Sequence, residues 1–178
     1  MDRKELRKEM ISRVKAFQGK AEESSEIVEM IRSSRQWQEA ETILAFHPLP
    51  SEPDISPLLE DERILLPYIE DGVMRFSSSR KLSLSAFGFM EPEHVEEGFS
   101  SALMLVPLLA YNGHYRLGRG GGFYDRYIAE NRERLLTAGV AFSVSYEPRY
   151  IPAAHDERLD MIFSPLDGNP ASQAWRGK

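Results

Sequence analysis

Short apolar runs alternate with helical patterns along most of this chain, and this alternation limits the folds open to it more than any other feature. The runs are continuously apolar, which is typical of strands that are covered on both faces. The expected strands are Ile43–His47, Arg63–Leu66, Val73–Phe76, Ala102–Leu105, Val140–Val144 and Met161–Phe163. We therefore predict an α/β fold in which one layered sheet is flanked by helices.

Apolar residues at helical spacing occupy several of the connections between these runs. The expected helices are residues 2–18 with Asp2 as the capping residue, a second helix from Ser24 or Ser25, Asp54–Glu62 and Tyr124–Leu136. The polar stretches Ser77–Ser79 and Glu91–Glu97 are expected to be loops. A chain of 178 residues is predicted to form a single domain, 1–178, with an irregular tail from about Pro165.

Composition narrows the chemistry that is open to the chain. It has no cysteine, which excludes disulfides, thiolate catalysis and thiolate-bound metals. Its net charge of −6 argues against a general nucleic-acid surface but leaves room for a local basic pocket. No apolar run approaches membrane-spanning length, and the charged start MDRKELRKEM is unlike a signal peptide. We expect a cytoplasmic monomer that acts on small molecules, without nucleic-acid or membrane partners.

The segment from Arg116 to Asp125, RLGRGGGFYD, combines four glycines and two arginines just before a predicted helix. Glycines let backbone N–H groups approach a ligand, and arginine offers forked donors to phosphate or carboxylate. A Gly-rich turn that leads into a helix is suited to binding an anion. The segment lacks the lysine of a Walker loop, and the dinucleotide pattern GxGxxG fails because its last position is Phe123. The alternative is a tight turn between strand and helix.

The longer segment Leu105–Ile128 resembles the signature of the 5-formyltetrahydrofolate cyclo-ligase family, also called methenyltetrahydrofolate synthetases. That signature runs from a strand ending in proline, through a short turn, to an RLGxGxGYYD loop and its helix. Further landmarks of the family are resembled, in order, by Arg3–Arg7, Ser51–Leu58 and Ile151–Asp160. The resemblance implies a fold similar to the sugar-phosphate isomerase and CoA-transferase-like group.

Two positions in the loop depart from the family pattern. Gly121 stands where the family often has lysine, which removes one phosphate-directed charge and leaves more to Arg116 or Arg119. Phe123 replaces the first tyrosine of the family's pair, which keeps an aromatic face and loses a hydroxyl.

The resemblance implies an ATP- and Mg²⁺-dependent closure of 5-formyltetrahydrofolate to 5,10-methenyltetrahydrofolate, with release of ADP and phosphate. Phosphorylation would make the formyl oxygen a leaving group, and N10 would then attack the activated carbon. Such a reaction depends mostly on positioning and electrostatics. Two alternatives stay open. One is a non-catalytic folate- or nucleotide-binding protein on the same fold, and the other is a sugar-phosphate or CoA-ester enzyme that shares only the architecture.

The resemblance also implies which residues form the site. The implied contacts with ATP are Arg3, Arg7, Arg116, Leu117, Gly118, Arg119, Gly120, Gly121, Gly122, Phe123 and Tyr124. The implied contacts with folate are His47, Glu52, Arg119, Gly120, Gly121, Gly122 and Phe123, of which Glu52 and Arg119 are also the catalytic residues. The implied Mg²⁺ ligands are Asp125 and Asp156, with Asp160 as a competitor, and Arg75 is a further candidate contact with the nucleotide.

Several of these residues also have a structural interpretation. Arg3 and Arg7 share one face of the first predicted helix, where they would equally form a solvated surface. Asp125 would equally be a capping acid, because a carboxylate is favoured in the first turn of a helix. Glu52 would otherwise be an exposed acid in a proline-rich loop.

Overall fold

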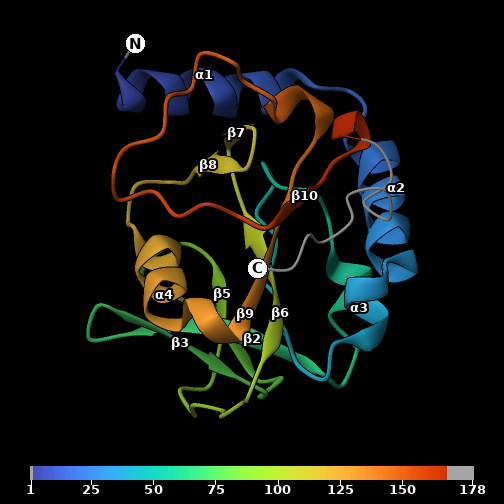
Figure 1. Cartoon of the computed structure of the whole chain (residues 1–178), viewed down its shortest axis with the longest axis vertical. Helices are drawn as coiled ribbons and strands as arrows, with labels where there is room; N and C mark the ends of the chain where they lie inside the picture. The colour runs from blue at the N-terminus through green and yellow to red at the C-terminus, as the bar shows by residue number, and fades with distance from the viewer. Residues whose placement is uncertain (1, 168–178) are drawn as a thin grey trace.

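The computed structural model describes residues 2–167, which form a central six-stranded sheet with helices on both faces (Figure 1). The strand order is β10-β9-β6-β1-β2-β3. The strands are β1 (Ile43–Leu44), β2 (Ile64–Glu70), β3 (Val73–Ser77), β6 (Ala102–Pro107), β9 (Leu135–Val140) and β10 (Met161–Phe163). All neighbours from β10 to β2 pair in parallel, whereas β3 is antiparallel to β2. The predicted α/β fold is confirmed.

The two faces of the sheet carry separate apolar clusters. Helices α2 (Lys20–Ser33) and α3 (Arg35–Glu39) cover one face, and α4 (Phe123–Asn131) covers the other (Figure 1). Within β1, Ile43 belongs to the cluster under α2 and α3, whereas Leu44 belongs to the cluster under α4. Successive side chains of a strand point to opposite faces, so a strand buried on both faces must be apolar throughout.

Helix α1 (Arg3–Ala16) lies across one end of the sheet, next to a short hairpin formed by β7 (Ala110–Asn112) and β8 (Tyr115–Leu117) (Figure 1). Leu6 and Met10 of α1 share an apolar cluster with residues of this hairpin and the segments beside it. The hairpin carries the chain from the end of β6 to the Gly-rich segment. This packing therefore holds the N-terminal helix beside that segment.

The largest correction to the sequence prediction concerns the last predicted helix. Helix α4 ends at Asn131 rather than Leu136, and β9 spans Leu135–Val140 rather than Val140–Val144. Residues 132–134 form a 3₁₀ turn between the two elements. A short apolar stretch such as Leu135-Leu136 fits a helix end or a strand start equally well, so periodicity alone cannot separate them. Pairing with β6 along its whole length decides for the strand.

Several smaller boundaries were also predicted wrongly. The expected helix Asp54–Glu62 is only a 3₁₀ turn, Ser56–Leu58, and the strand expected at Ile43–His47 is limited to Ile43–Leu44. Helix α2 begins at Lys20, so Ser24 lies inside the helix, where its buried Oγ accepts a hydrogen bond from the Asp54 backbone. The side chain of Asp2 makes no capping hydrogen bond at the start of α1.

The sequence prediction missed both hairpins outside the main sheet. The second hairpin pairs β4 (Leu82–Leu84) with β5 (Met90–Pro92), and β5 enters the region that was expected to be a loop, Glu91–Glu97. Strand β4 has only three residues, Leu82-Ser83-Leu84, and all of them are exposed, so it is too short for a periodic pattern and lacks the continuous apolar run of a buried strand. The predicted irregular tail begins with a 3₁₀ turn at Pro165–Asp167, and its remainder lies outside the described residues. No described helix has the length and apolar character that crossing a membrane would need.

Candidate active site

A cavity of about 320 Å³ lies where the Gly-rich segment, the start of α1, the loop after β1 and the β4–β5 hairpin meet. The carboxyl ends of neighbouring parallel strands form a common edge, and the chain leaving β1 and β6 enters the cavity wall at this edge. The sequence-predicted residues that line the cavity are Arg3, Arg7, His47, Glu52, Arg116, Gly118, Arg119, Gly120, Gly121, Gly122, Phe123, Tyr124, Asp125 and Asp156. Leu117 is instead buried in the apolar cluster beneath α1.

The Gly-rich loop connects β8 to α4 and needs glycine at several positions. Gly120 and Gly122 have φ values of +109° and +69°, in the region that side chains rarely adopt. A Cβ atom at Gly118 would lie 2.5 Å from the Arg116 guanidinium. Apart from Arg119, whose side chain also lines the cavity, the loop therefore presents backbone without side chains to the cavity. The loop is a tight turn between a strand and a helix, as the alternative interpretation of the sequence predicted, and it also borders the cavity.

Arg116 lies beneath the loop and is only 5% exposed. One terminal nitrogen is 3.2 Å from Asp125 Oδ2, and the other donates to the Pro107 carbonyl at 3.4 Å. The guanidinium carbon lies 5.3 Å from the centre of the Tyr124 ring. Within the described chain, the buried Nε of Arg116 has no hydrogen-bond partner. A buried arginine thus sits at the cavity wall with donor capacity to spare.

The first helix contributes two arginines that are engaged with the site. Arg3 Nη2 lies 2.6 Å from Asp156 Oδ2 and 2.9 Å from the Tyr150 hydroxyl. Arg7 Nε donates to the Gly118 carbonyl at 2.9 Å. The two residues therefore do not form a purely solvated helix face. They attach α1 to the Gly-rich loop and to the segment that follows β9.

Asp156 is held in its ionised form. Burial acts to raise the pKa of its carboxyl group, but hydrogen bonds from the Ala153 backbone, Arg3 and Tyr150 outweigh that effect and lower the pKa. The Ala153 N–H lies 2.6 Å from Oδ2. Burial also raises the pKa of the Tyr150 hydroxyl, so this group remains a proton donor at neutral pH. A carboxylate is therefore maintained at the cavity wall.

Glu52 is buried, with 7% of its surface exposed, so the interpretation as an exposed loop acid is wrong. Its Oε2 accepts a hydrogen bond from the Leu49 backbone at 2.8 Å, and its Oε1 lies 3.3 Å from Arg119 Nε. Arg119 also donates to the Ser51 hydroxyl. Burial raises the pKa of Glu52 despite these favourable partners. A raised pKa makes this carboxylate a stronger base than an ordinary glutamate, which suits it to accepting a proton.

The acidic residues of the site are too few to enclose a magnesium ion by themselves. They are suited to a magnesium ion that is also bound by the phosphate groups of a substrate. Asp125 is occupied by Arg116 and by a hydrogen bond from the Glu157 backbone at 3.1 Å. In the described part of the chain, no three His, Asp or Glu residues gather as metal ligands. Magnesium commonly takes only one or two carboxylates beside substrate phosphates and water. Asp125 and Asp156 both border the cavity and meet that requirement.

The other candidate acid and the extra arginine do not belong to the cavity wall. Asp160 Oδ2 accepts hydrogen bonds from the backbone and the hydroxyl of Thr137 at 2.8 and 3.0 Å, where it ties β10 to β9. Arg75 pairs with the exposed Glu96 at 2.8 Å. Both residues therefore have structural partners outside the pocket.

Sequence reasoning missed the apolar side of the cavity. Phe87 and Phe89 of the β4–β5 hairpin line it, and the Phe87 ring lies 5.3 Å from that of Phe123 in an edge-to-face arrangement. Phe87 is 55% exposed although it is a large apolar residue. His155 also lines the cavity. The sequence around these residues does not show that they reach the cavity. Phe87 and Phe89 reach it through the pairing of β4 with β5, which was not predicted.

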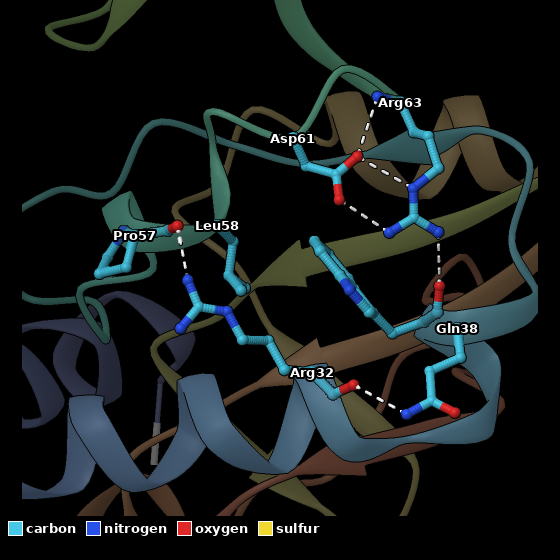
Figure 2. Close-up of a pocket in the computed structure, with 7 residues that line it drawn as sticks. Arg32, Gln38, Pro57, Leu58, Asp61 and Arg63 are labelled. Atoms are coloured by element: carbon cyan, nitrogen blue, oxygen red, sulfur yellow. Dashed lines mark hydrogen bonds and ion pairs between the residues drawn. The ribbon is translucent and has the colours of Figure 1, made fainter.

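A second hollow lies between α2, α3 and the segment before β2 (Figure 2). Arg63 spans it through two hydrogen bonds to Asp61 and others to the backbone carbonyls of Trp37 and Ala40. Arg32 donates to the Pro57 carbonyl at 2.9 Å. These contacts tie the helices to the sheet, and we interpret the hollow as a structural junction.

The fold and the cavity together define an α/β protein with an arginine-flanked, glycine-rich pocket suited to a multiply charged anion. The sequence model of the 5-formyltetrahydrofolate cyclo-ligase family matches residues 1–165. The chain therefore belongs to the 5-formyltetrahydrofolate cyclo-ligase family.

Individual relatives agree with this assignment. A 5,10-methenyltetrahydrofolate synthetase from Aquifex aeolicus is 27% identical with a TM-score of 0.75, over 92% of this chain and 90% of the other. A 5,10-methenyltetrahydrofolate synthetase from Mycoplasma pneumoniae shares the fold with a TM-score of 0.67 at 21% identity, over 92% and 98% of the two chains. A 5-formyltetrahydrofolate cyclo-ligase from Mycoplasma genitalium is 36% identical over 59 residues, which is 33% of this chain and 35% of the relative. The sequence match thus spans about a third of that curated relative.

Proposed function

We propose that this protein catalyses the ATP- and Mg²⁺-dependent cyclisation of 5-formyltetrahydrofolate to 5,10-methenyltetrahydrofolate. The observation that carries the proposal is the meeting, in one cavity, of a glycine-rich loop, four arginines and a buried glutamate. Membership of the family gives the reaction class, and the cavity supplies groups for its two demands. These demands are to neutralise phosphate charge and to position two reactants.

The proposed reaction has two chemical steps. The formyl oxygen attacks the terminal phosphorus of ATP, the bond to the bridging oxygen breaks, and ADP leaves. N10 then attacks the activated formyl carbon and forms the new C–N bond. The C–O bond breaks with its electron pair, so inorganic phosphate departs, and the proton of N10 is lost. The product is the cyclic methenyl compound.

We assign the charged groups to these steps according to their surroundings. The loop from Gly118 to Gly122 would wrap the phosphates through backbone N–H groups, with Arg3, Arg7 and Arg116 adding charge. Arg119 and Glu52 would face the reacting formyl group and N10. The raised pKa of Glu52 supports a role in accepting the proton that N10 loses. Arg119, which is paired with that carboxyl, would stabilise charge on the transferred phosphoryl group.

The remaining groups would hold the ligands in place. Phe123 and Tyr124 offer aromatic surface at the end of the loop, and His47 lines the same cavity. A magnesium ion held by Asp125 and Asp156 would neutralise phosphate charge as the phosphoryl group is transferred. We propose that the protein acts as a monomer in the cytoplasm.

A direct assay tests the proposal. Purified protein, Mg-ATP and 5-formyltetrahydrofolate should generate the near-ultraviolet absorbance of the methenyl product, together with one ADP for each product molecule. The matched controls omit ATP, replace it with a non-hydrolysable analogue, or add a magnesium chelator. Folded protein that gives no product across a range of pH and magnesium concentrations would refute the proposal.

The same experiment separates the alternative of a non-catalytic folate- or nucleotide-binding protein. Every carboxylate of the site that we assign to catalysis or to metal is already paired with an arginine, which is the observation in favour of that alternative. Calorimetric binding of nucleotide or folate without ADP formation would support it. Repeated turnovers would eliminate it.

A further inference from the structure

Arg126, in the first turn of α4, places a guanidinium group against the outer side of the Gly-rich loop. Its Nη1 donates to the Gly121 carbonyl at 3.0 Å, and its Cζ lies 5.1 Å from the centre of the Phe123 ring. Helical side chains lean back towards the N-terminus, which explains how the group reaches the loop. The residue does not line the cavity itself and is exposed.

The position of this charge is electrostatically unusual. The N-terminus of a helix carries partial positive charge, so a cation in the first turn is disfavoured unless an anion is close. Across residues 2–167, Arg126 forms no ion pair with a carboxylate. Among these described residues, only a carbonyl oxygen and an aromatic ring contact its guanidinium group. An anion at the loop would turn an unfavourable position into a favourable one.

The other cations at the loop are mostly neutralised. Arg3, Arg116 and Arg119 each lie within 3.3 Å of a carboxylate oxygen, so these three pairs add no net charge. Arg7 resembles Arg126, because it donates to a loop carbonyl and forms no ion pair within the described chain. The two unpaired arginines approach the loop from α1 and from α4. They supply the net positive charge that a magnesium–nucleotide complex, which is an anion, would need.

The loop itself has no room to provide this charge. A Cβ atom at Gly121 would lie 2.7 Å from the Phe123 ring, and one at Gly122 would lie 2.7 Å from the Arg126 guanidinium. Positive charge at this end of the loop must therefore come from a neighbouring element, and α4 provides it. Beneath the same loop, the buried Nε of Arg116 also has no hydrogen-bond partner within the described chain, so a second arginine keeps a donor free at this site.

We propose that Arg126 binds the phosphates of the nucleotide from the solvent side of the Gly-rich loop and strengthens the selection of the triphosphate. The inference rests on the proposed function and extends it to a residue outside the cavity wall. Its ligand chemistry is a phosphate oxyanion. The carboxylates of a folate glutamate tail share part of that chemistry, so the experiment measures both substrates.

The experiment compares wild-type protein with R126A, R126K and R35A. Arg35 lies on α3 with 82% of its side chain exposed, so R35A removes the same charge at a distance from the site. Calorimetry measures the binding of Mg-ATP without folate, and steady-state kinetics measures KM for each substrate. We expect R126A to weaken ATP binding and raise KM for ATP about tenfold. R126K should have an ATP affinity and a KM for ATP between those of the wild type and R126A, because an ammonium group keeps the charge but lacks the planar fork. R35A should match the wild type in both quantities.

Three outcomes would overturn the inference, and they are distinguishable. Unchanged ATP binding in a folded R126A protein that turns over normally refutes the role of Arg126 and leaves the proposed function intact. An increase in KM confined to folates with long glutamate tails assigns the residue to the tail instead. Failure of the wild-type protein to bind Mg-ATP refutes the proposed function together with this inference.

Discussion

At the residue scale, three arginines of the candidate site are already paired with acids before any ligand is considered. Arg3, Arg116 and Arg119 take Asp156, Asp125 and Glu52 as partners. Such pairs fix the direction of each guanidinium group and leave its other nitrogens available to an anion. The pair of exposed Arg119 and buried Glu52 allows the contribution of each partner to be tested by substitution.

Arg119→Ala should lower kcat/KM by about tenfold to a hundredfold, because the variant loses the group that we propose to stabilise the transferred phosphoryl group. Its side chain is 41% exposed, but its partner Glu52 is buried, so the variant should stay folded with a loss of about 2–4 °C in thermal unfolding. Steady-state kinetics for both substrates and a thermal melt check this expectation. An unchanged rate with unchanged Michaelis constants would contradict the assignment.

Glu52→Gln should separate activity from stability. Burial raises the pKa of Glu52 in the folded protein, so ionisation of this group costs folding free energy. That cost is absent at a pH below the pKa of Glu52 in the unfolded chain. It grows as the pH rises from this pKa to the higher pKa of Glu52 in the folded protein, and it is complete above the latter. The glutamine variant lacks it, so the variant should become more stable relative to the wild type as the pH rises.

The measurement is chemical denaturation of wild-type and Glu52→Gln protein at about pH 4 and about pH 8. Activity of the variant should fall by about a hundredfold or more, because an amide accepts no proton. If the variant instead becomes less stable than the wild type as the pH rises, the pairing of Glu52 with Arg119 stabilises the ionised carboxylate more than burial destabilises it.

At the element scale, the loop and helix α4 act as one unit. Gly122 has a left-handed backbone at the helix start, and Asp125 in the first turn connects the helix to Arg116 and to the Glu157 backbone. The β4–β5 hairpin brings Phe87 against Phe123 at the start of α4. The charged and apolar parts of the site thus come from elements that are distant in the sequence.

Asp125→Asn should change both the helix and the metal requirement. The variant leaves the buried Arg116 without its charge partner, so we expect a loss of about 1–2 kcal/mol in unfolding free energy. If Asp125 also holds magnesium, half-maximal activity should need a higher Mg²⁺ concentration. Denaturation and a magnesium titration of the rate check the two effects separately. Lower stability with an unchanged magnesium requirement would leave Asp125 with the structural role alone.

At the scale of the whole molecule, α1 is held to the rest of the chain by an ion-pair cluster beside the site. Glu147 has a side chain that is 2% exposed and lies 2.8 Å from Arg13 of α1 and 2.7 Å from Arg149, which also pairs with Glu9 of α1. Hydrogen bonds from Arg149, assisted by those from Arg13, lower the pKa of Glu147 to about 2. Because α1 also carries Arg3 and Arg7, this cluster helps to position the site.

Glu147→Gln should destabilise the fold by about 2 kcal/mol at neutral pH, because two arginines lose a shared carboxylate. A lowered pKa means that the stabilisation is present above the usual range of a glutamate and is lost as the pH falls towards about 2. Urea denaturation at neutral and acid pH should therefore show a difference that shrinks on acidification. Glu39→Gln, in an exposed i,i+4 pair, should cost less than about 0.5 kcal/mol at either pH.

The sequence by itself determined the α/β class, because strands buried on both faces must be apolar throughout. It also determined the Gly-rich loop and its family, because that motif is contiguous and two of its glycines, Gly120 and Gly122, meet a local demand of the backbone. The confirmed strand Met161–Phe163 and the buried face of α1 were readable for the same reason.

Only the tertiary structure decided where local signals were ambiguous or contacts were distant in the chain. Pairing with β6 assigned Leu135–Val140 to a strand, and packing placed Glu52 in a buried position beside Arg119. The net positive charge at the loop also depends on which arginines form an ion pair with a carboxylate. Their partners lie up to 153 residues away in the sequence. Such choices follow from burial and from opposite charges meeting in space, which no local stretch of sequence records.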